Sequence, residues 1–139
     1  MCHMNRSRLA VLVLILGGLF AAAPALAVKY IRSVVTSTWL VPPESCPPEP
    51  DASGKCTREF VRAPGQEFHE FDVTVTCRKL TPARQYHVLW GRDWGVAGSY
   101  PVTADGKGKL SVQFTVMSDR LPWVVVTDDE GCVVLQEEY

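Results

Sequence analysis

The feature that most constrains this chain is a two-residue alternation of apolar and polar side chains. Apolar residues occupy every second position from Phe71 to Cys77. Because successive side chains of a β-strand point to opposite faces, this spacing predicts a half-buried strand with Cys77 directed into the core. The alternation returns after a Gly-containing turn predicted at residues 105–108. Its inward positions there are Leu110, Val112, Phe114 and Val116.

Short strands are predicted along most of the remaining chain, and no stretch of ten residues after residue 27 has sustained helical spacing. Proline lacks the backbone donor of a ladder, so residues 42–56 are interpreted as a proline-rich loop. Seven or so short strands separated by turns favour an all-β fold, an antiparallel β-sandwich. The other predicted strands are residues 28–41, 57–63, 86–90, 99–104, 123–127 and 132–137.

The first 27 residues have the three parts of a secretory signal. Arg6 and Arg8 precede an uncharged apolar run, residues 9–27, that ends in Ala-Leu-Ala. We expect cleavage after Ala27 and a secreted or periplasmic location for residues 28–139. The alternative is a single-pass membrane anchor with an uncleaved N-terminal helix, since the run approaches the roughly 20 residues that a spanning helix needs.

The part of the chain after residue 27 is weakly acidic. It holds 12 of the 14 basic side chains and all 15 acidic ones, which gives a net charge of −3. This balance provides no basic field for nucleic acid, which we therefore exclude as a partner, or for anionic lipid. Its length fits one domain.

Four cysteines follow residue 27, and an even number in an oxidising compartment favours two disulfides over a metal site. Three pairings are open to the sequence alone. We favour Cys46–Cys56, which closes the proline-rich loop, together with Cys77–Cys132, which ties an inward strand residue to the last strand. Redox chemistry is disfavoured because the chain has no C-x-x-C motif.

Three local patterns resemble bacterial immunoglobulin-like and fibronectin-type modules. Residues 80–88, LTPARQYHV, resemble the L-x-P-x-x-x-Y-x-V corner, in which the Tyr hydroxyl hydrogen-bonds to the upstream backbone. Residues 102–108 look like the T-x-D-x-x-G hairpin of these modules, and residues 124–131 resemble their closing hairpin. The resemblance covers roughly residues 68–137. It implies an immunoglobulin-like β-sandwich with an extracellular binding or structural role.

The most unusual local sequence is WGRDWG at residues 90–95. It is expected in a loop at one end of the sandwich, where such folds bind partners, and Trp and Arg are enriched at interface hot spots. The alternative is structural: Trp90 lies in the core, Arg92 pairs with Asp93, and Trp94 covers the sandwich end. The predicted contact surface comprises Trp90, Arg92, Asp93, Trp94 and Tyr100.

Catalytic and metal-binding signatures are weak. No Ser lies in a G-x-S-x-G elbow, and His69 and His87, the two histidines after residue 27, are too few for a metal site. The acidic residues 128–131 lack the ligand spacing of a Ca²⁺ loop. We therefore assign no catalytic residue, metal or cofactor, and an enzymatic role is not favoured.

The leading hypothesis is a non-enzymatic exported domain that binds an extracellular or envelope protein or a glycan. One alternative is a small secreted hydrolase or hydrolase inhibitor, with the stiffened loop at residues 42–56 as the inhibitory segment. Another is a structural envelope protein held by an uncleaved N-terminal helix. The identity of the partner and the oligomeric state are not encoded in any motif of the sequence.

Overall fold

The computed structural model describes residues 32–138 except for residues 46, 63, 64 and 94. The predicted signal segment therefore lies outside the described residues, as does the start of the strand predicted at 28–41. All regular structure within the described part is β-strand, so the predicted all-β class is confirmed. The strands are β1 (Arg32–Val41), β2 (Ser53–Arg62), β3 (His69–Arg78), β4 (Gln85–Arg92), β5 (Gly95–Thr103), β6 (Leu110–Ser118), β7 (Trp123–Asp128) and β8 (Val133–Glu137).

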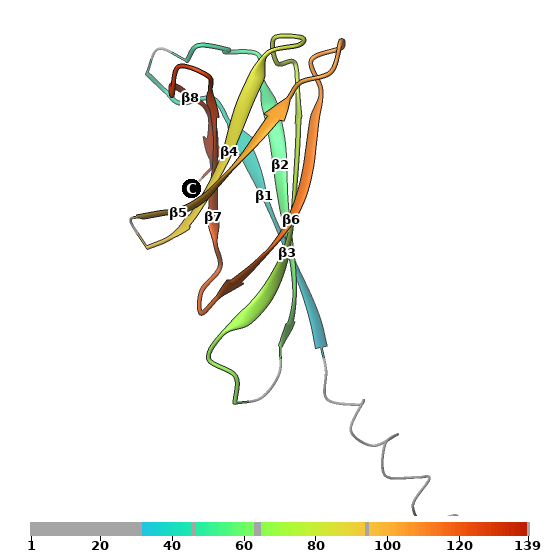
Figure 1. The fold of residues 1–139 in the computed structure, drawn as a ribbon, viewed down its shortest axis with the longest axis vertical. Coiled ribbons are helices and arrows are strands. Elements are labelled where there is room, and N and C mark those ends of the chain that lie inside the picture. Colours follow the sequence, from blue (N-terminus) through green and yellow to red (C-terminus); the bar gives the residue numbers. More distant parts are fainter. Residues whose placement is uncertain (1–31, 46, 63–64, 94, 139) are drawn as a thin grey trace, which may run out of the picture. The chain divides into compact units, whose positions relative to one another are not determined.

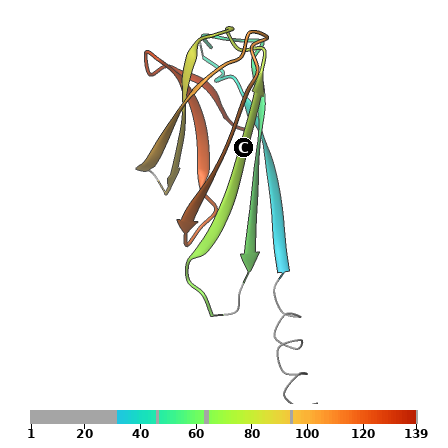
Figure 2. The same ribbon diagram turned by 45° about the vertical axis from the view of Figure 1, so that its right-hand side comes forward.

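The strands form a single antiparallel sheet in the order β5-β4-β7-β8-β1-β2-β3-β6. A short pairing of Leu40 with Glu137 and of Val41 with Gln136 joins β1 to β8 and so links the two halves of the sheet. The sheet curves until its edge strands β5 and β6 approach each other (Figures 1 and 2). There Tyr100 stacks on Phe114 with ring centroids 4.3 Å apart. The result is a nearly closed barrel rather than a clear two-sheet sandwich.

The core lies inside this barrel, and the predicted alternation places it correctly. The inward side chains predicted on β3 are all buried, from Phe71 at 2% exposure to Cys77 at 5%. On β6, Leu110, Phe114 and Val116 are buried, and Val112 is partly buried and packs against them. The register of β3 with β6 aligns these rows, because Val73 faces Phe114 and Val75 faces Val112.

The predicted proline-rich loop is shorter than expected, because residues 53–56 belong to β2 and pair with β3. Cys56 is consequently fully buried in a strand and does not bracket a loop. Two-residue periodicity continues along β2. Its alternate positions Cys56, Arg58 and Phe60 face inward, with exposures below those of Lys55 and Glu59.

A charged pair lies inside the barrel, where the alternating pattern would place apolar residues. Arg58 of β2 is fully buried and forms an ion pair with Glu137 of β8. Its Nε donates to the carbonyl of Pro122 at 2.6 Å, and its Nη1 donates to Thr38 Oγ1 at 3.0 Å. Glu137 Oε1 also accepts the amide of Val124 at 3.1 Å. The guanidinium thus connects β1, β2, β8 and the loop before β7.

The connection between β3 and β4 contains the hydrogen bond implied by the resemblance at residues 80–88. The amide of Thr81 donates to the Tyr86 hydroxyl at 3.0 Å, and that hydroxyl donates to Glu49 Oε1 at 2.5 Å. Thr81 Oγ1 also donates to Glu49, at 2.9 Å. The buried Tyr86 therefore ties the β3–β4 corner to the loop between β1 and β2. Burial, followed by the hydrogen bond to Glu49, raises the pKa of Tyr86 to about 12.

The predicted disulfide Cys77–Cys132 is wrong for this structure. Both thiols are free, as is that of Cys56. A disulfide between these residues requires the start of the last strand to lie beside Cys77 of β3. Instead β8 pairs with β7 and β1, which leaves Cys132 exposed in the turn before β8, while Cys77 faces Gly54 of β2. Cys46 lies outside the described residues, and the predicted disulfide Cys46–Cys56 lies outside them with it.

No described residue belongs to a helix with the length and apolar character needed to cross a membrane.

Candidate binding pocket

The structure describes four of the five residues predicted as a contact surface, and these four differ in burial. Trp90 is partly buried and packs against the core, as the structural alternative predicted. Tyr100 is also partly buried, stacked on Phe114 where the barrel closes. Arg92 and Asp93 are exposed at the β4–β5 turn, and Trp94 lies outside the described residues. A binding role for this group stays a prediction.

The exposed charges at the β4–β5 turn are compensated by the loop that precedes β7. Arg92 Nη1 lies 3.5 Å from Asp119 Oδ1, and Arg120 Nη1 lies 2.6 Å from Asp93 Oδ1. Trp123 Nε1 donates to the carbonyl of Asp93 at 3.1 Å. The predicted pairing of Arg92 with Asp93 is thus replaced by two pairs with a neighbouring loop. These ion pairs connect the β4–β5 turn with the loop between β6 and β7.

The acidic turn between β7 and β8 is also explained by internal contacts. Possible ligand atoms of Asp128, Glu130 and Cys132 lie within 4.8 Å of one another. However, Asp128 Oδ1 accepts the amides of Glu130 and Cys132 at 3.1 and 2.8 Å, and its Oδ2 lies 3.1 Å from Arg84 Nη2. Because both Asp128 oxygens are engaged, these residues form a well-capped turn.

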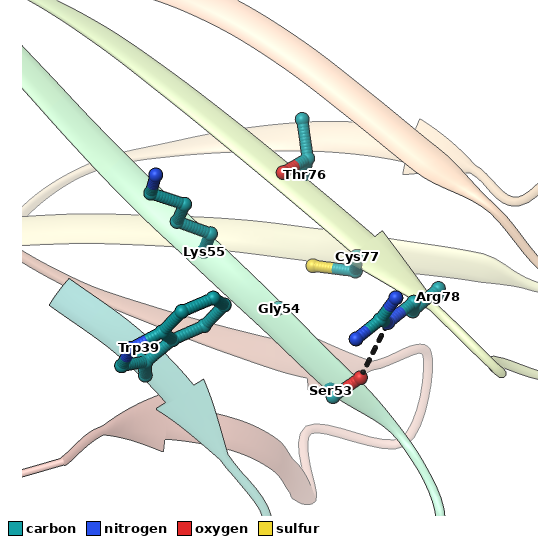
Figure 3. Close-up of a pocket in the computed structure, with 7 residues that line it drawn as sticks. All are labelled: Trp39, Ser53, Gly54, Lys55, Thr76, Cys77 and Arg78. Atoms are coloured by element: carbon teal, nitrogen blue, oxygen red, sulfur yellow. Dashed lines mark hydrogen bonds between the residues drawn. The ribbon is translucent and has the colours of Figure 1, made fainter. Parts of the chain in front are cut away.

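A pocket of about 250 Å³ lies on the outer face of β1, β2 and β3 (Figure 3). Each of the three neighbouring strands contributes to it, and the strand backbone at Gly54 lies between the other lining residues. The lining consists of Trp39 from β1, Ser53, Gly54 and Lys55 from β2, and Thr76, Cys77 and Arg78 from β3.

Trp39 provides the apolar wall of this pocket. Its side chain is 59% exposed, although its neighbour Leu40 is fully buried in the core. Alternation along β1 therefore directs the indole outward, where it stands beside polar residues. Lys55 Nζ lies 5.8 Å from the ring centroid, within the range of a cation–π contact. A large aromatic ring exposed in this way is a common feature of binding surfaces.

Arg78 provides the opposite wall. Its Nε donates to Ser53 Oγ at 3.1 Å, and this bond orients the guanidinium toward the space above Gly54 (Figure 3). Among the arginines whose side chains the structure describes, Arg78 is the one without a carboxylate partner. With Lys55, it gives the lining two cations and no acidic group.

Gly54 allows the strands to approach closely beneath the pocket. A Cβ at this position would lie 2.9 Å from the carbonyl oxygen of Thr76 and 3.0 Å from Cys77 Sγ. A side chain here would push β2 and β3 apart. The lining from Ser53 to Lys55 was missed in the sequence because it was assigned to the proline-rich loop. The alternation of Lys55, Thr57 and Glu59 was the signal that would have extended the strand.

The residues that line the pocket do not pair a nucleophile with a histidine or carboxylate base. The hydroxyls of Ser53 and Thr76 have no histidine or carboxylate beside them in the lining. Burial, with a smaller effect from nearby Cys56, raises the pKa of the Cys77 thiol to about 12. The thiol is therefore protonated at neutral pH, and a thiol is a poor nucleophile compared with its thiolate. The lining residues include no histidine or carboxylate that would act as a base.

A larger hollow of about 460 Å³ lies where β5 and β6 diverge, and Thr76, Cys77, Val102 and Leu110 contribute to its wall. It contains no aromatic side chain. Its acidic member, Asp105, accepts the amides of Lys107 and Lys109 at 2.8 Å each, so this carboxylate serves the β5–β6 turn. We therefore consider the pocket at Trp39 the better candidate.

Comparison with known proteins gives no relative from which a role could be transferred: no family model, no curated protein and no solved structure matches the chain.

Proposed function

We propose that this chain is an exported, non-enzymatic binding module that holds a saccharide in the pocket at Trp39. The observation that carries the proposal is the 59% exposed indole at the edge of a pocket whose other walls are polar. A sugar ring is amphipathic, with an apolar C–H face and a rim of hydroxyls. Its C–H face would stack on Trp39, and its hydroxyls would hydrogen-bond with Ser53 and Thr76.

The wider context of the proposal comes from the sequence. Export is supported by the signal-like pattern of residues 1–27. An immunoglobulin-like character, which is a finer assignment than the antiparallel β-fold itself, is supported by the Thr81–Tyr86 hydrogen bond at the corner of residues 80–88. A glycan was among the partners predicted from sequence. The proposed site differs from the predicted one at residues 90–100.

The test is binding of the purified full chain to a panel of immobilised neutral and acidic polysaccharides. Trp39→Ala is expected to abolish retention and to leave the melting temperature almost unchanged, because the indole is mostly exposed. Val35→Ala is the matched control, since Val35 is 60% exposed on the same strand and lies outside the pocket. Absence of retention by every polysaccharide, or equal retention of wild type and Trp39→Ala, would contradict the proposal.

A further inference from the structure

The charges around the pocket indicate what kind of saccharide it accepts. Lys55 lies near the Trp39 ring, Arg78 lies across the pocket from it, and no carboxylate belongs to the lining (Figure 3). The nearest outward acids along the same strands are Glu59 on β2 and Asp72 on β3. Glu59 lies two outward positions beyond Lys55 along β2, and Asp72 lies two outward positions beyond Thr76 along β3. On the other side of Trp39, the exposed Glu138 follows β8 and its amide donates to the Trp39 carbonyl at 3.0 Å, so the basic character belongs to the β2–β3 side of the pocket.

The acids of the outer face are also engaged elsewhere. Glu59 Oε1 accepts a hydrogen bond from Ser33 Oγ at 2.6 Å, and Asp72 Oδ1 accepts one from Thr115 Oγ1 at 2.7 Å. The register gives Lys55 the neutral neighbour Thr76. Neither cation of the pocket has a carboxylate within ion-pair distance among the described residues. An anionic ligand on the β2–β3 side of the pocket would therefore meet two positive charges that no described carboxylate neutralises.

Arg84 contrasts with Arg78 among the arginines whose side chains the structure describes. Arg84 lies within 4.0 Å of three carboxylates, those of Glu49, Asp128 and Asp129. Arg78 has one hydrogen bond among the described residues, the bond from Nε to Ser53 Oγ. Its two terminal nitrogens point their four N–H groups at no described acceptor. This end of the guanidinium has the geometry that binds two oxygens of a carboxylate, sulfate or phosphate.

We propose that the ligand of the Trp39 pocket is an acidic saccharide, whose carboxylate, sulfate or phosphate group is bound by Arg78 and Lys55 while a sugar ring stacks on Trp39. This inference rests on the proposed function and narrows it to one chemical class. Arg78 supplies the directional contact through its planar fork. Lys55, already held near the indole face, supplies a second charge to the same anion.

The test measures affinity of the full chain for matched probes by titration calorimetry. The first pair is oligogalacturonate and its methyl ester, which differ in charge and share the sugar. The second pair is dextran sulfate and dextran. The first pair therefore tests binding of a carboxylate, and the second tests binding of a sulfate. We expect each acidic probe to bind about tenfold or more tightly than its neutral partner, as a charge-assisted hydrogen bond predicts.

Variants assign the effect to the pocket. Arg78→Gln is expected to remove most of the preference for the acidic probe, because its affinity for the acidic probe falls about tenfold or more relative to its affinity for the neutral probe. Trp39→Ala is expected to weaken both probes of a pair. Arg92→Gln is the control for general charge, because Arg92 is an exposed arginine outside the pocket that pairs with Asp119. Melting temperatures of all three variants show whether each remains folded.

The outcomes separate this inference from the function on which it rests. If the acidic and neutral probes bind equally and Trp39→Ala removes both, saccharide binding stands and the preference for an anion is overturned. If Arg92→Gln lowers affinity for the acidic probe as much as Arg78→Gln does, the attraction is general and the inference is likewise overturned. If no saccharide binds, both proposals fail.

Discussion

Two arginines on neighbouring strands show opposite uses of the same side chain. Arg58 of β2 points into the barrel, is fully buried, and is neutralised by Glu137. Arg78 of β3 points outward and has Ser53 as its hydrogen-bond partner among the described residues. A buried charge that lost its partner would destabilise the fold severely, whereas an exposed one is solvated. The inner arginine therefore has a structural role, and the outer one is available to a ligand.

The partners of the inner arginine explain why a charge is tolerated inside so small a barrel. Arg58 contacts Thr38, Pro122 and Glu137, which lie on different strands or loops. Val124 of β7 donates to the same carboxylate. Because β1 and β8 share only a short pairing, this network supplements the backbone hydrogen bonds that join the two halves of the sheet. We infer that it fixes their register.

The largest expected effect comes from removing the charge inside the barrel. Glu137→Gln is expected to lower the free energy of unfolding by about 3–5 kcal/mol, because it removes the charge of Glu137 from beside the buried Arg58 guanidinium. Urea denaturation measures the change. Arg78→Gln is the control and is expected to stay within about 0.5 kcal/mol of wild type. A Glu137→Gln protein as stable as wild type would show that the charge of Glu137 does not stabilise the buried Arg58.

A double substitution sharpens the same comparison. Replacing Arg58 and Glu137 together with Met removes both charges and keeps most of the packed volume. We expect this protein to be more stable than Glu137→Gln, since apolar side chains frequently substitute for a buried ion pair at little cost.

The second largest effect is expected where the outer pocket meets the core. Gly54→Ala places a Cβ 2.9 Å from the Thr76 carbonyl oxygen and 3.0 Å from Cys77 Sγ. Overpacking of this kind costs about 1–3 kcal/mol, again measured by urea denaturation. Gly95→Ala is the matched control, because a Cβ there would meet nothing within 4 Å. Equal stability of the two variants would mean that β2 and β3 separate freely at the pocket floor.

Local patterns were sufficient to predict the strands but not their neighbours. The alternation on β3 and β6 gave the inward rows correctly, because burial on one face imposes a period of two. The pairing of β8 with β1 depends on contacts between the two ends of the chain, about which no local motif is informative. The Cys77–Cys132 prediction failed for this reason. The alternation rule also treats charged residues as outward, so Arg58 was overlooked.

The candidate pocket was harder to predict than the fold. Trp39, Lys55 and Arg78 are far apart in the sequence and meet because β1, β2 and β3 are adjacent in the sheet. By contrast, the WGRDWG segment attracted attention because its unusual residues are contiguous. In the structure Trp90 packs against the core, and Arg92 pairs with Asp119. The closely spaced Trp and Arg residues of WGRDWG thus make structural contacts. That Arg78 has no carboxylate partner among the described residues could be recognised only from the positions of its neighbours in the structure.

A smaller effect on stability is expected at the β3–β4 corner, where the hydroxyl of the buried Tyr86 contacts Thr81 and Glu49. Tyr86→Phe removes the hydrogen bonds to Glu49 and from Thr81, and we expect a loss of about 1–2 kcal/mol in the free energy of unfolding. Thr57→Val, on the outer face of β2, controls for loss of an exposed hydroxyl. A corner that contributes nothing would leave Tyr86→Phe and Thr57→Val equally stable.

The same tyrosine predicts a pH dependence of stability. Its pKa is raised from 10.0 to about 12 on folding, so between these values the native state binds more protons than the unfolded state. The contribution of Tyr86 is therefore fully present below pH 10 and is lost as the pH rises toward about 12. Cys56 and Cys77 titrate in a similar range, with pKa values raised to about 11 and 12 by burial. The difference between wild type and Tyr86→Phe isolates the tyrosine, and it should shrink above pH 10.

The smallest effect is expected for an arginine that is paired but exposed. Arg92 is 49% exposed, and its Nη1 lies 3.5 Å from Asp119 Oδ1. Such pairs contribute about 0–1 kcal/mol and are screened by salt, so Arg92→Gln should lower the free energy of unfolding slightly at low salt and negligibly at high salt. The loss in Glu137→Gln should persist at high salt, because burial excludes the screening ions. If salt abolished both losses equally, burial would not be what distinguishes Arg58 from the surface arginines, and the structural role assigned to the inner pair would have to be abandoned.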